Sequence, residues 1–243
     1  MPMDSVQVRQ ALKGDELQRV LHKAELAPRA KPRALQVSER TREELIKLVQ
    51  RLFFSTDPAA RVVVFSAVEP QAGCSWTSAR IAEILADRTD GLVCLIDANF
   101  RARTLYSEFH CENPAQLADD EWSVVPVSGP DKLTSNLWLL SYRPATGDCP
   151  TAGSLERFQK RIEDLRNDFN YVLIDAPPLK GSAEAALFAR MADGLVLVLE
   201  ANTTRRETAK KAKQLLDASA VPVLGAVLNK RVFPIPEQLY RRL

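Results

Sequence analysis

The chain of 243 residues lacks the cysteine pattern of a disulfide-bonded or zinc-binding protein. Its four cysteines, Cys74, Cys94, Cys111 and Cys149, lie far apart and form no Cys-x-x-Cys pair. Neither a disulfide framework nor a zinc site is indicated, and a reducing compartment is the simplest setting.

A long apolar run is absent too. No stretch approaches the roughly 20 residues that a membrane-spanning helix needs, and the first four residues have neither the basic nor the apolar region of a signal peptide. We therefore expect a cytoplasmic protein.

There is also no excess of charge of one sign. Lysine and arginine total 33 against 31 for aspartate and glutamate, a net charge of +2. This balance gives no field that would favour nucleic acid or membrane as the main partner, and we expect no nucleic-acid binding. The hydrophobic fraction of 46% and charged fraction of 26% exclude a disordered chain.

Aliphatic and β-branched residues are concentrated in five short runs of the kind buried on both faces of a parallel sheet. These runs are residues 61–66, 92–96, 171–174, 194–199 and 221–228. Helical patterns occur at residues 38–54, 77–87, 155–167, 183–191 and 204–218. The alternation predicts an α/β fold with a doubly wound, mostly parallel sheet and helices on both faces. Residues 111–148 are less regular, with one candidate strand at 137–141.

An N-terminal extension precedes this α/β region. Residues 5–25 have apolar side chains at helical spacing, and residues 27–33 combine two prolines with basic residues, which indicates a linker. A packing helix and a helix for a partner both remain open. With Ser38 as N-cap of the first domain helix, we divide the chain into an N-terminal helix and linker (1–37) and one α/β domain (38–243).

Polar residues follow several predicted strands, at the sheet edge where such folds bind ligands. The first strand is followed by a loop with Gly73 and by Ser75 at a helix start, the layout of a phosphate cradle. Asp97 and Asp175 each follow a buried run, where a carboxylate is costly unless it is bound. Ser75, Asp97 and Asp175 suggest a site for Mg²⁺ and phosphates, and Asn229 is placed to read an adenine edge.

Each of these residues also has a structural interpretation. Asp97 could cap the following turn, Asp175 could be a turn residue before two prolines, and Asn229 could end a strand. Together and in this order, they are more specific than any one alone.

Three motifs carry a resemblance to a known family. Residues 70–76 (PQAGCSW) stand where that family has its Walker A motif, Pro-Gly-Glu-Gly-Lys-Ser-Thr. Residues 95–101 (LIDANFR) match its second acidic motif, and residues 171–178 (YVLIDAPP) match its Walker B motif. Over residues 43–230 the chain resembles the bacterial tyrosine kinases (BY-kinases) of capsule and exopolysaccharide synthesis, within the ParA/MinD-like P-loop ATPases. The ParA/MinD proteins themselves fit less well, because Glu69 stands at their signature lysine.

The resemblance implies Mg-ATP or Mg-ADP as ligand and the cytoplasmic part of a membrane-embedded polysaccharide co-polymerase as partner. It assigns nucleotide contacts to Gly73, Cys74, Ser75, Trp76 and Asn229. It assigns Mg²⁺ to Ser75, Asp97 and Asp175, of which Asp97 and Asp175 would be catalytic in an active enzyme.

The departures from the family pattern concern chemistry. Cys74 replaces the Walker A lysine, and Asn99 replaces an aspartate and is unable to accept a proton. Loss of a charged hydrogen bond to the ligand should cost roughly 1.5–3 kcal/mol in binding, and loss of a transition-state donor about 10²–10³ in rate. Arg101 and Arg103 are candidates for a substitute cation.

The loop differs at two further points, and Cys74 itself has a second interpretation. Gln71 replaces a glycine, and the large ring of Trp76 could crowd the phosphate site. Because Cys74 lies at a helix N-terminus, its pKa is expected to fall, which would permit a redox-sensitive thiol. The alternative is that Cys74 simply fills a vacated position.

Substrate and assembly motifs are also reduced. The family's C-terminal tyrosine cluster is represented by Tyr240 alone, and its Glu-x-x-Arg-x-x-Arg motif by Glu44, Lys47 and Gln50. Ring assembly is therefore weakened, because glutamine lacks the guanidinium fork that binds a carboxylate. Self-association remains open.

We therefore expect a catalytically degenerate BY-kinase-like protein, a pseudokinase with weak or absent Mg-nucleotide binding. It would be a regulatory or binding component of exopolysaccharide or capsule synthesis and export, cytoplasmic and held at the inner membrane by its partner. The first alternative is an active ATP-dependent tyrosine autokinase or ATPase that uses a substitute cation. The second is a ParA/MinD-like positioning ATPase.

Overall fold

The computed structural model describes residues 37–55, 59–102, 105–109, 115–116, 122–127, 136–144 and 150–231. The predicted N-terminal helix and linker lie outside these residues, as do Arg103, Cys111, Cys149 and Tyr240. Among the described parts of the chain, no helix is long and apolar enough to cross a lipid bilayer.

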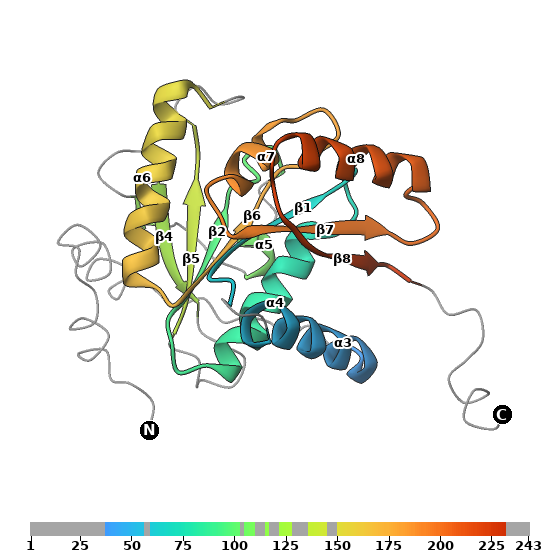
Figure 1. Cartoon of the computed structure of the whole chain (residues 1–243). Coiled ribbons are helices and arrows are strands. Elements are labelled where there is room, and N and C mark those ends of the chain that lie inside the picture. Colours follow the sequence, from blue (N-terminus) through green and yellow to red (C-terminus); the bar gives the residue numbers. More distant parts are fainter. Residues whose placement is uncertain are drawn as a thin grey trace.

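The described strands form one eight-stranded sheet in the order β3-β4-β5-β2-β6-β1-β7-β8 (Figure 1). The strands are β1 (Val62–Ala67), β2 (Val93–Asp97), β3 (Ala115–Gln116), β4 (Trp122–Val127), β5 (Leu137–Tyr142), β6 (Tyr171–Asp175), β7 (Gly194–Glu200) and β8 (Val223–Asn229). The six strands from β5 to β8 in the sheet order are parallel, and β4 pairs antiparallel with β5 and β3. The predicted mostly parallel sheet is confirmed.

Helices cover both faces of the sheet, as Figure 1 shows. One face carries α3 (Glu39–Val49), the π-helical turn η1 (Gln50–Phe54), α4 (Cys74–Arg88) and α5 (Leu105–Glu108). The other face carries α6 (Ala152–Asp168), α7 (Glu184–Ala189) and α8 (Arg206–Ala218). The doubly wound arrangement is therefore confirmed as well.

The central strand β1 illustrates why the apolar runs are continuous. All its residues are buried. Val62 and Val64 belong to the core on the α6–α8 face, whereas Val63 and Phe65 belong to the core on the α3–α5 face. A strand that packs on both sides has no polar face, so its sequence does not alternate.

Helix α3 begins as the sequence predicts. The side chain of Ser38 accepts a hydrogen bond from the backbone N–H of Thr41 at 3.3 Å. This contact satisfies one of the unpaired donors at the helix start. At its other end the helix widens into the π-helical turn η1, where Leu52 and Phe53 are buried.

Strands β3 and β4 were not predicted. Pro126 within β4 argues against a strand, because proline has no N–H for a sheet ladder. The short strand β3 pairs with β4 only at Ser123 and Val124, so Pro126 lies beyond its reach. On its other side β4 pairs with β5 along its whole length. The proline is thus accommodated next to an edge that is largely open within the described residues.

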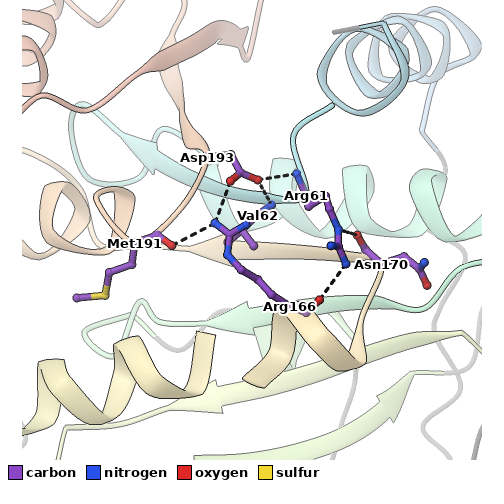
Figure 2. Close-up of polar contacts among 6 residues, drawn as sticks. All are labelled: Arg61, Val62, Arg166, Asn170, Met191 and Asp193. Carbon is purple, nitrogen blue, oxygen red and sulfur yellow. Dashed lines mark hydrogen bonds and ion pairs between the residues drawn. The ribbon is translucent and has the colours of Figure 1, made fainter. Parts of the chain in front are cut away.

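A polar cluster fixes the amino end of β1, at the end of the strands away from the loops that follow them (Figure 2). One carboxylate oxygen of Asp193 accepts hydrogen bonds from the backbone N–H groups of Arg61 at 2.7 Å and Val62 at 2.8 Å, and the other binds Arg166 at 2.9 Å. The Arg61 guanidinium donates to the carbonyl of Asn170. Partial burial acts to raise the pKa of Asp193, but the hydrogen bonds from Val62, Arg166 and Arg61 outweigh it and lower the pKa.

Candidate functional site

The polar residues predicted after the strands gather at the carboxyl end of the sheet. Strands β2, β6 and β1 are neighbours, and Asp97 on β2 pairs in register with Asp175 on β6. Asp175 in turn pairs with Phe65 on β1, just before the loop that leads to α4. The topology therefore brings Asp97, Asp175 and the start of α4 together, as expected from a parallel sheet.

The β1–α4 loop (residues 68–73) adopts left-handed turns at two positions. Gly73, the residue before α4, has φ +82°, and Gln71 has φ +65°. Gln71 stands where the family motif has glycine, and its backbone is left-handed although the residue has a side chain. Such a conformation costs roughly 1–2 kcal/mol for a residue other than glycine. The loop thus adopts this turn against a local penalty.

Asp175 is the most enclosed carboxylate of the site. The hydroxyl of Ser75 donates to its Oδ2 at 2.5 Å, while no partner is found for Oδ1 among the described residues. Burial raises the pKa of Asp175 to about 7, although hydrogen bonds from Ser75 and Cys74 act in the opposite direction. A neutral, protonated Asp175 is therefore well populated near neutral pH when no cation is bound.

Cys74 faces Asp175 and is buried, with 7% of its surface exposed. Burial raises the pKa of its thiol well above the ordinary value, and the Asp175 carboxylate raises it further. The expectation that a helix N-terminus would lower this pKa is wrong, because desolvation and a neighbouring negative charge dominate. The structure gives no basis for a reactive thiolate at Cys74.

The end of β2 and the loop that follows it contribute two more buried polar residues. Asp97 is 2% exposed and Asn99 is 7% exposed. The Asn99 Oδ1 atom has no hydrogen-bond partner among the described residues, and the backbone N–H of Ala98 donates to the carbonyl of Asp175 at 2.9 Å. This hydrogen bond ties the two acidic strand ends together.

The oxygen donors of Ser75, Asp97 and Asp175 fit a magnesium ion in chemical type, because Mg²⁺ binds hard oxygen ligands. The buried Oδ1 of Asp175 offers an acceptor without a protein donor. No group of three or more His, Cys, Asp or Glu residues able to hold a metal by itself occurs in the described part of the chain. Mg²⁺ commonly completes its shell with waters and substrate phosphates, so few protein ligands are needed.

Arg101, a candidate substitute cation, is engaged elsewhere. Its guanidinium forms an ion pair with Glu184 at 2.8 Å. Glu184 lies at the start of α7, is buried, and also accepts a hydrogen bond from the hydroxyl of Ser182. The arginine is thus held towards α7 in this structure.

Two lysines that sequence reasoning missed contact the β1–α4 loop. The Lys180 ammonium pairs with Glu69 of the loop at 2.8 Å. The Lys230 ammonium donates to the backbone carbonyl of Gln71 at 2.6 Å and pairs with Glu200 at 3.3 Å. The signal was present in the sequence: Lys180 follows β6 by a few residues and Lys230 directly follows β8, so both belong to the ligand edge of the sheet.

Asn229 packs on the back of the same loop. Its side-chain amide donates to the carbonyl of Ala72 at 2.9 Å. A Cβ atom added to Gly73 would lie 2.3 Å from the Asn229 amide nitrogen, so the Asn229 side chain would have to shift to admit any other residue, in addition to the strain at the Gly73 φ angle. The adenine-reading role of Asn229 stays a prediction.

Trp76 and the family's assembly motif also have defined places. The Trp76 ring is partly buried and packs against the apolar core of the α3–α5 face. On α3, Glu44 and Lys47 form an exposed ion pair at 2.7 Å. Their charges therefore bind each other within one helix, at a distance typical of an i,i+3 pair.

Comparison with known proteins places these motifs in a family. No family model matches the chain. The chain is 30% identical over 173 residues to the tyrosine-protein kinase CpsD of Streptococcus agalactiae, covering 70% of this chain and 75% of that protein. It is 28% identical over 179 residues to the tyrosine-protein kinase YwqD of Bacillus subtilis, covering 73% and 75% respectively.

Solved structures show the same fold. The chimerical protein CapA2B2 superposes with a TM-score of 0.67 at 20% identity, over 89% of this chain and 99% of that one. The kinase domain of the Escherichia coli tyrosine kinase ETK gives 0.62 at 18% identity, over 81% and 78%. MinD in its MinC complex from Aquifex aeolicus gives 0.56 at 22% identity, over 75% and 72%. With its P-loop ATPase fold and its similarity to CpsD, the chain belongs to the bacterial tyrosine kinase (BY-kinase) family.

Proposed function

We propose that this chain is a catalytically degenerate BY-kinase that serves as a regulatory or binding component of exopolysaccharide or capsule synthesis and export. One observation carries the proposal: position 74, the family's lysine, holds a buried neutral thiol that faces Asp175. In P-loop chemistry that lysine neutralises the β- and γ-phosphates of the nucleotide. A protonated thiol supplies no such charge.

The neighbouring cations support the same proposal. Lys180, Lys230 and Arg101 each form an ion pair with a glutamate. A paired cation adds little net field at the loop, because its glutamate opposes the approach of phosphate. The three pairs together therefore compensate poorly for one unpaired lysine in the centre of the site.

The parts that remain suit weak nucleotide binding. The N-terminus of α4 and the N–H groups around Gly73 can bind an anion, and Ser75, Asp97 and Asp175 would hold Mg²⁺. The metal, when bound, would neutralise charge on the phosphates. Asp175 must lose its proton before it can act as a ligand, which its raised pKa makes harder near neutral pH.

An active ATPase or tyrosine autokinase is the second candidate. It is favoured by the position of Lys180 and Lys230, whose side chains are 64% and 47% exposed and contact the β1–α4 loop. Either lysine could exchange its glutamate for a phosphate oxygen. Under that hypothesis one of them, rather than residue 74, supplies the catalytic charge.

A partner and a location follow from family membership. We infer that the chain acts in the cytoplasm and is held at the inner membrane by the cytoplasmic part of a polysaccharide co-polymerase. A pull-down with the cytoplasmic segments of a co-polymerase from the same operon would test this inference, with the detached N-terminal extension (residues 1–37) as a separate bait.

An activity assay separates the two candidates. Purified protein is incubated with Mg-ATP, and phosphate release and tyrosine phosphorylation are followed alongside the Asp175→Ala variant. We expect no difference between the two proteins above background. Turnover or phosphotyrosine that disappears in Asp175→Ala would reject the degenerate form. A further loss in Lys180→Met, or in Lys230→Met with the β1–α4 loop still rigid, would identify the substitute cation.

A further inference from the structure

Two consecutive side chains at the end of β8 hold two consecutive carbonyls of the β1–α4 loop. The Asn229 amide binds the carbonyl of Ala72 at 2.9 Å, and the Lys230 ammonium binds the carbonyl of Gln71 at 2.6 Å. The residues joined are 157 and 159 positions apart in the sequence. The loop is therefore fixed from its carbonyl side by the last described strand.

Lys230 is itself held in place by charge and backbone geometry. Its ammonium lies 3.3 Å from the carboxylate of Glu200, and Glu200 at the end of β7 pairs in register with Asn229. Lys230 has φ +55°, so the chain turns sharply directly after β8. The ammonium thus bridges a carboxylate on β7 and a carbonyl of the loop.

The carbonyl that Lys230 binds belongs to the residue with the least favourable backbone in the loop. Gln71 has φ +65°, a conformation that disfavours side chains other than glycine. A hydrogen bond from a charged donor is of the size needed to offset such a penalty. Without that bond, the loop would be free to relax away from the shape in which Gly73 and the start of α4 can receive an anion.

We propose that Lys230 is a positioning residue that holds the β1–α4 loop in its left-handed turn at Gln71 and so couples the loop to the end of β8. The coupling acts through the Gln71 carbonyl and not through contact with a ligand. This role of Lys230 rests on the proposed function in one respect only, which is that the ligand of the β1–α4 loop would be a nucleotide. The position of the loop itself is a property of the chain without ligand.

The test measures the loop in the absence of nucleotide. Backbone amide NMR relaxation of the full chain gives order parameters for residues 71–73 in the wild type, Lys230→Met, Lys230→Arg and Glu200→Gln. A rigid backbone has an order parameter near 0.85, and a flexible one falls below about 0.6. We expect Lys230→Met to lower the order parameters of residues 71–73 into the flexible range, Lys230→Arg to keep them rigid, and Glu200→Gln to have an intermediate effect.

Lys213→Met is the matched control, because Lys213 is an exposed lysine of α8 whose ion pair with Asp217 resembles that of Lys230 but lies away from the loop. It should leave the order parameters of residues 71–73 unchanged. Unchanged values in Lys230→Met, or an equal loss in Lys213→Met, would overturn the proposal. If Lys230→Met does not fold, Glu200→Gln decides. Loop order parameters equal to those of the wild type in Glu200→Gln, with a rigid loop in Lys230→Arg as well, would overturn the proposal.

A second readout connects the loop to its ligand. Titration with Mg-ADP should show about tenfold weaker binding for Lys230→Met than for the wild type and Lys230→Arg, as expected for loss of one charged contact. If no variant binds Mg-ADP, the proposed nucleotide binding fails, while the NMR result still decides the role of Lys230. Weaker binding with rigid residues 71–73 would contradict positioning and indicate direct contact with the ligand.

Discussion

The hydroxyl of Ser75 donates a hydrogen bond of 2.5 Å to Asp175, a residue 100 positions later in the chain. This bond joins the start of α4 to the end of β6 without any cation. Cys74 faces the same carboxylate, so the site is closed by neutral donors where the family motif has a lysine. The consequences can be measured in stability as well as in binding.

Replacement of Asp175 by asparagine should stabilise the protein at alkaline pH. Burial raises the pKa of Asp175 from 3.8 to about 7, so the folded state holds a proton that the unfolded state loses. Stability of the wild type should therefore fall as the pH rises from about 4 to about 7 and stay low above that. Asp175→Asn keeps an acceptor for Ser75, and its free energy of unfolding at pH 8 should exceed that of the wild type by on the order of 1–3 kcal/mol.

Urea unfolding at pH 4.5 and pH 8 would check this, with the two proteins expected to be nearly equal at the lower pH. A variant less stable than the wild type at pH 8 would mean that Asp175 is ionised and stabilised in the folded protein.

Replacement of Asp193 by alanine should destabilise the fold with the opposite dependence on pH. Hydrogen bonds from Val62, Arg166 and Arg61 outweigh the effect of partial burial and lower the pKa of Asp193 below 3.8. Its contribution is therefore present above pH 4 and is lost as the pH falls towards the folded-state pKa. At pH 7 the free energy of unfolding of Asp193→Ala should be roughly 1–2 kcal/mol lower than that of the wild type, a range that allows for the partial exposure of the carboxylate.

Asp217→Ala, which removes an exposed carboxylate paired with Lys213 on α8, is the control and should change stability by less than about 0.5 kcal/mol. Equal effects of the two variants would show that the cluster in Figure 2 contributes no more than an ordinary surface ion pair.

Replacement of Gly73 by alanine separates crowding from backbone strain. Gly73 and Gly181 have almost the same φ angle, +82° and +83°. A Cβ at position 73 would meet the Asn229 amide at 2.3 Å, whereas one at position 181 has nothing within 4 Å. In both alanine variants the left-handed backbone should lower the free energy of unfolding by about 1 kcal/mol. In Gly73→Ala the clash should lower it by roughly a further 1–3 kcal/mol.

Thermal or urea unfolding of the two variants measures the difference. Equal losses would indicate that Asn229 moves away freely, and the contact between Asn229 and the loop would then be weak.

The layered sheet could be predicted from the sequence because β1, β2, β6 and β7 are apolar on both faces, so each forms an uninterrupted run. β3 and β4 could not, since Pro126 masks the strand pattern and β3 has only two residues. Their pairing depends on β5, a neighbour that local patterns do not reveal.

The acidic part of the site followed from strand ends alone. Asp97 and Asp175 come together because parallel strands end at one edge, and the sequence shows where each run stops. The positions of the charged side chains around the β1–α4 loop could not be predicted from the sequence. Lys230 reaches Gln71 through a left-handed turn after β8, and Arg101, in the turn after β2, points towards a buried glutamate on α7. The direction in which each of these two side chains points is set by tertiary packing.

The Cys74 pKa shows how a local rule can mislead. A helix N-terminus lowers the pKa of an accessible thiol, but it acts on Cys74 together with burial and the Asp175 carboxylate, which raise the pKa. Neither burial nor the neighbour 101 positions away is visible in the motif. The sign of the shift was therefore not predictable from the sequence.

Calorimetric titration of the wild type and Cys74→Lys with Mg-ADP and Mg-ATP tests the central claim most directly, with Asp97→Ala as a control for metal-dependent binding. The absence of a fixed positive charge at residue 74 predicts weak or no binding by the wild type. It also predicts at least about tenfold tighter binding by Cys74→Lys, the gain expected from one charged hydrogen bond to phosphate. Tight binding by the wild type that Cys74→Lys leaves unchanged would contradict the account.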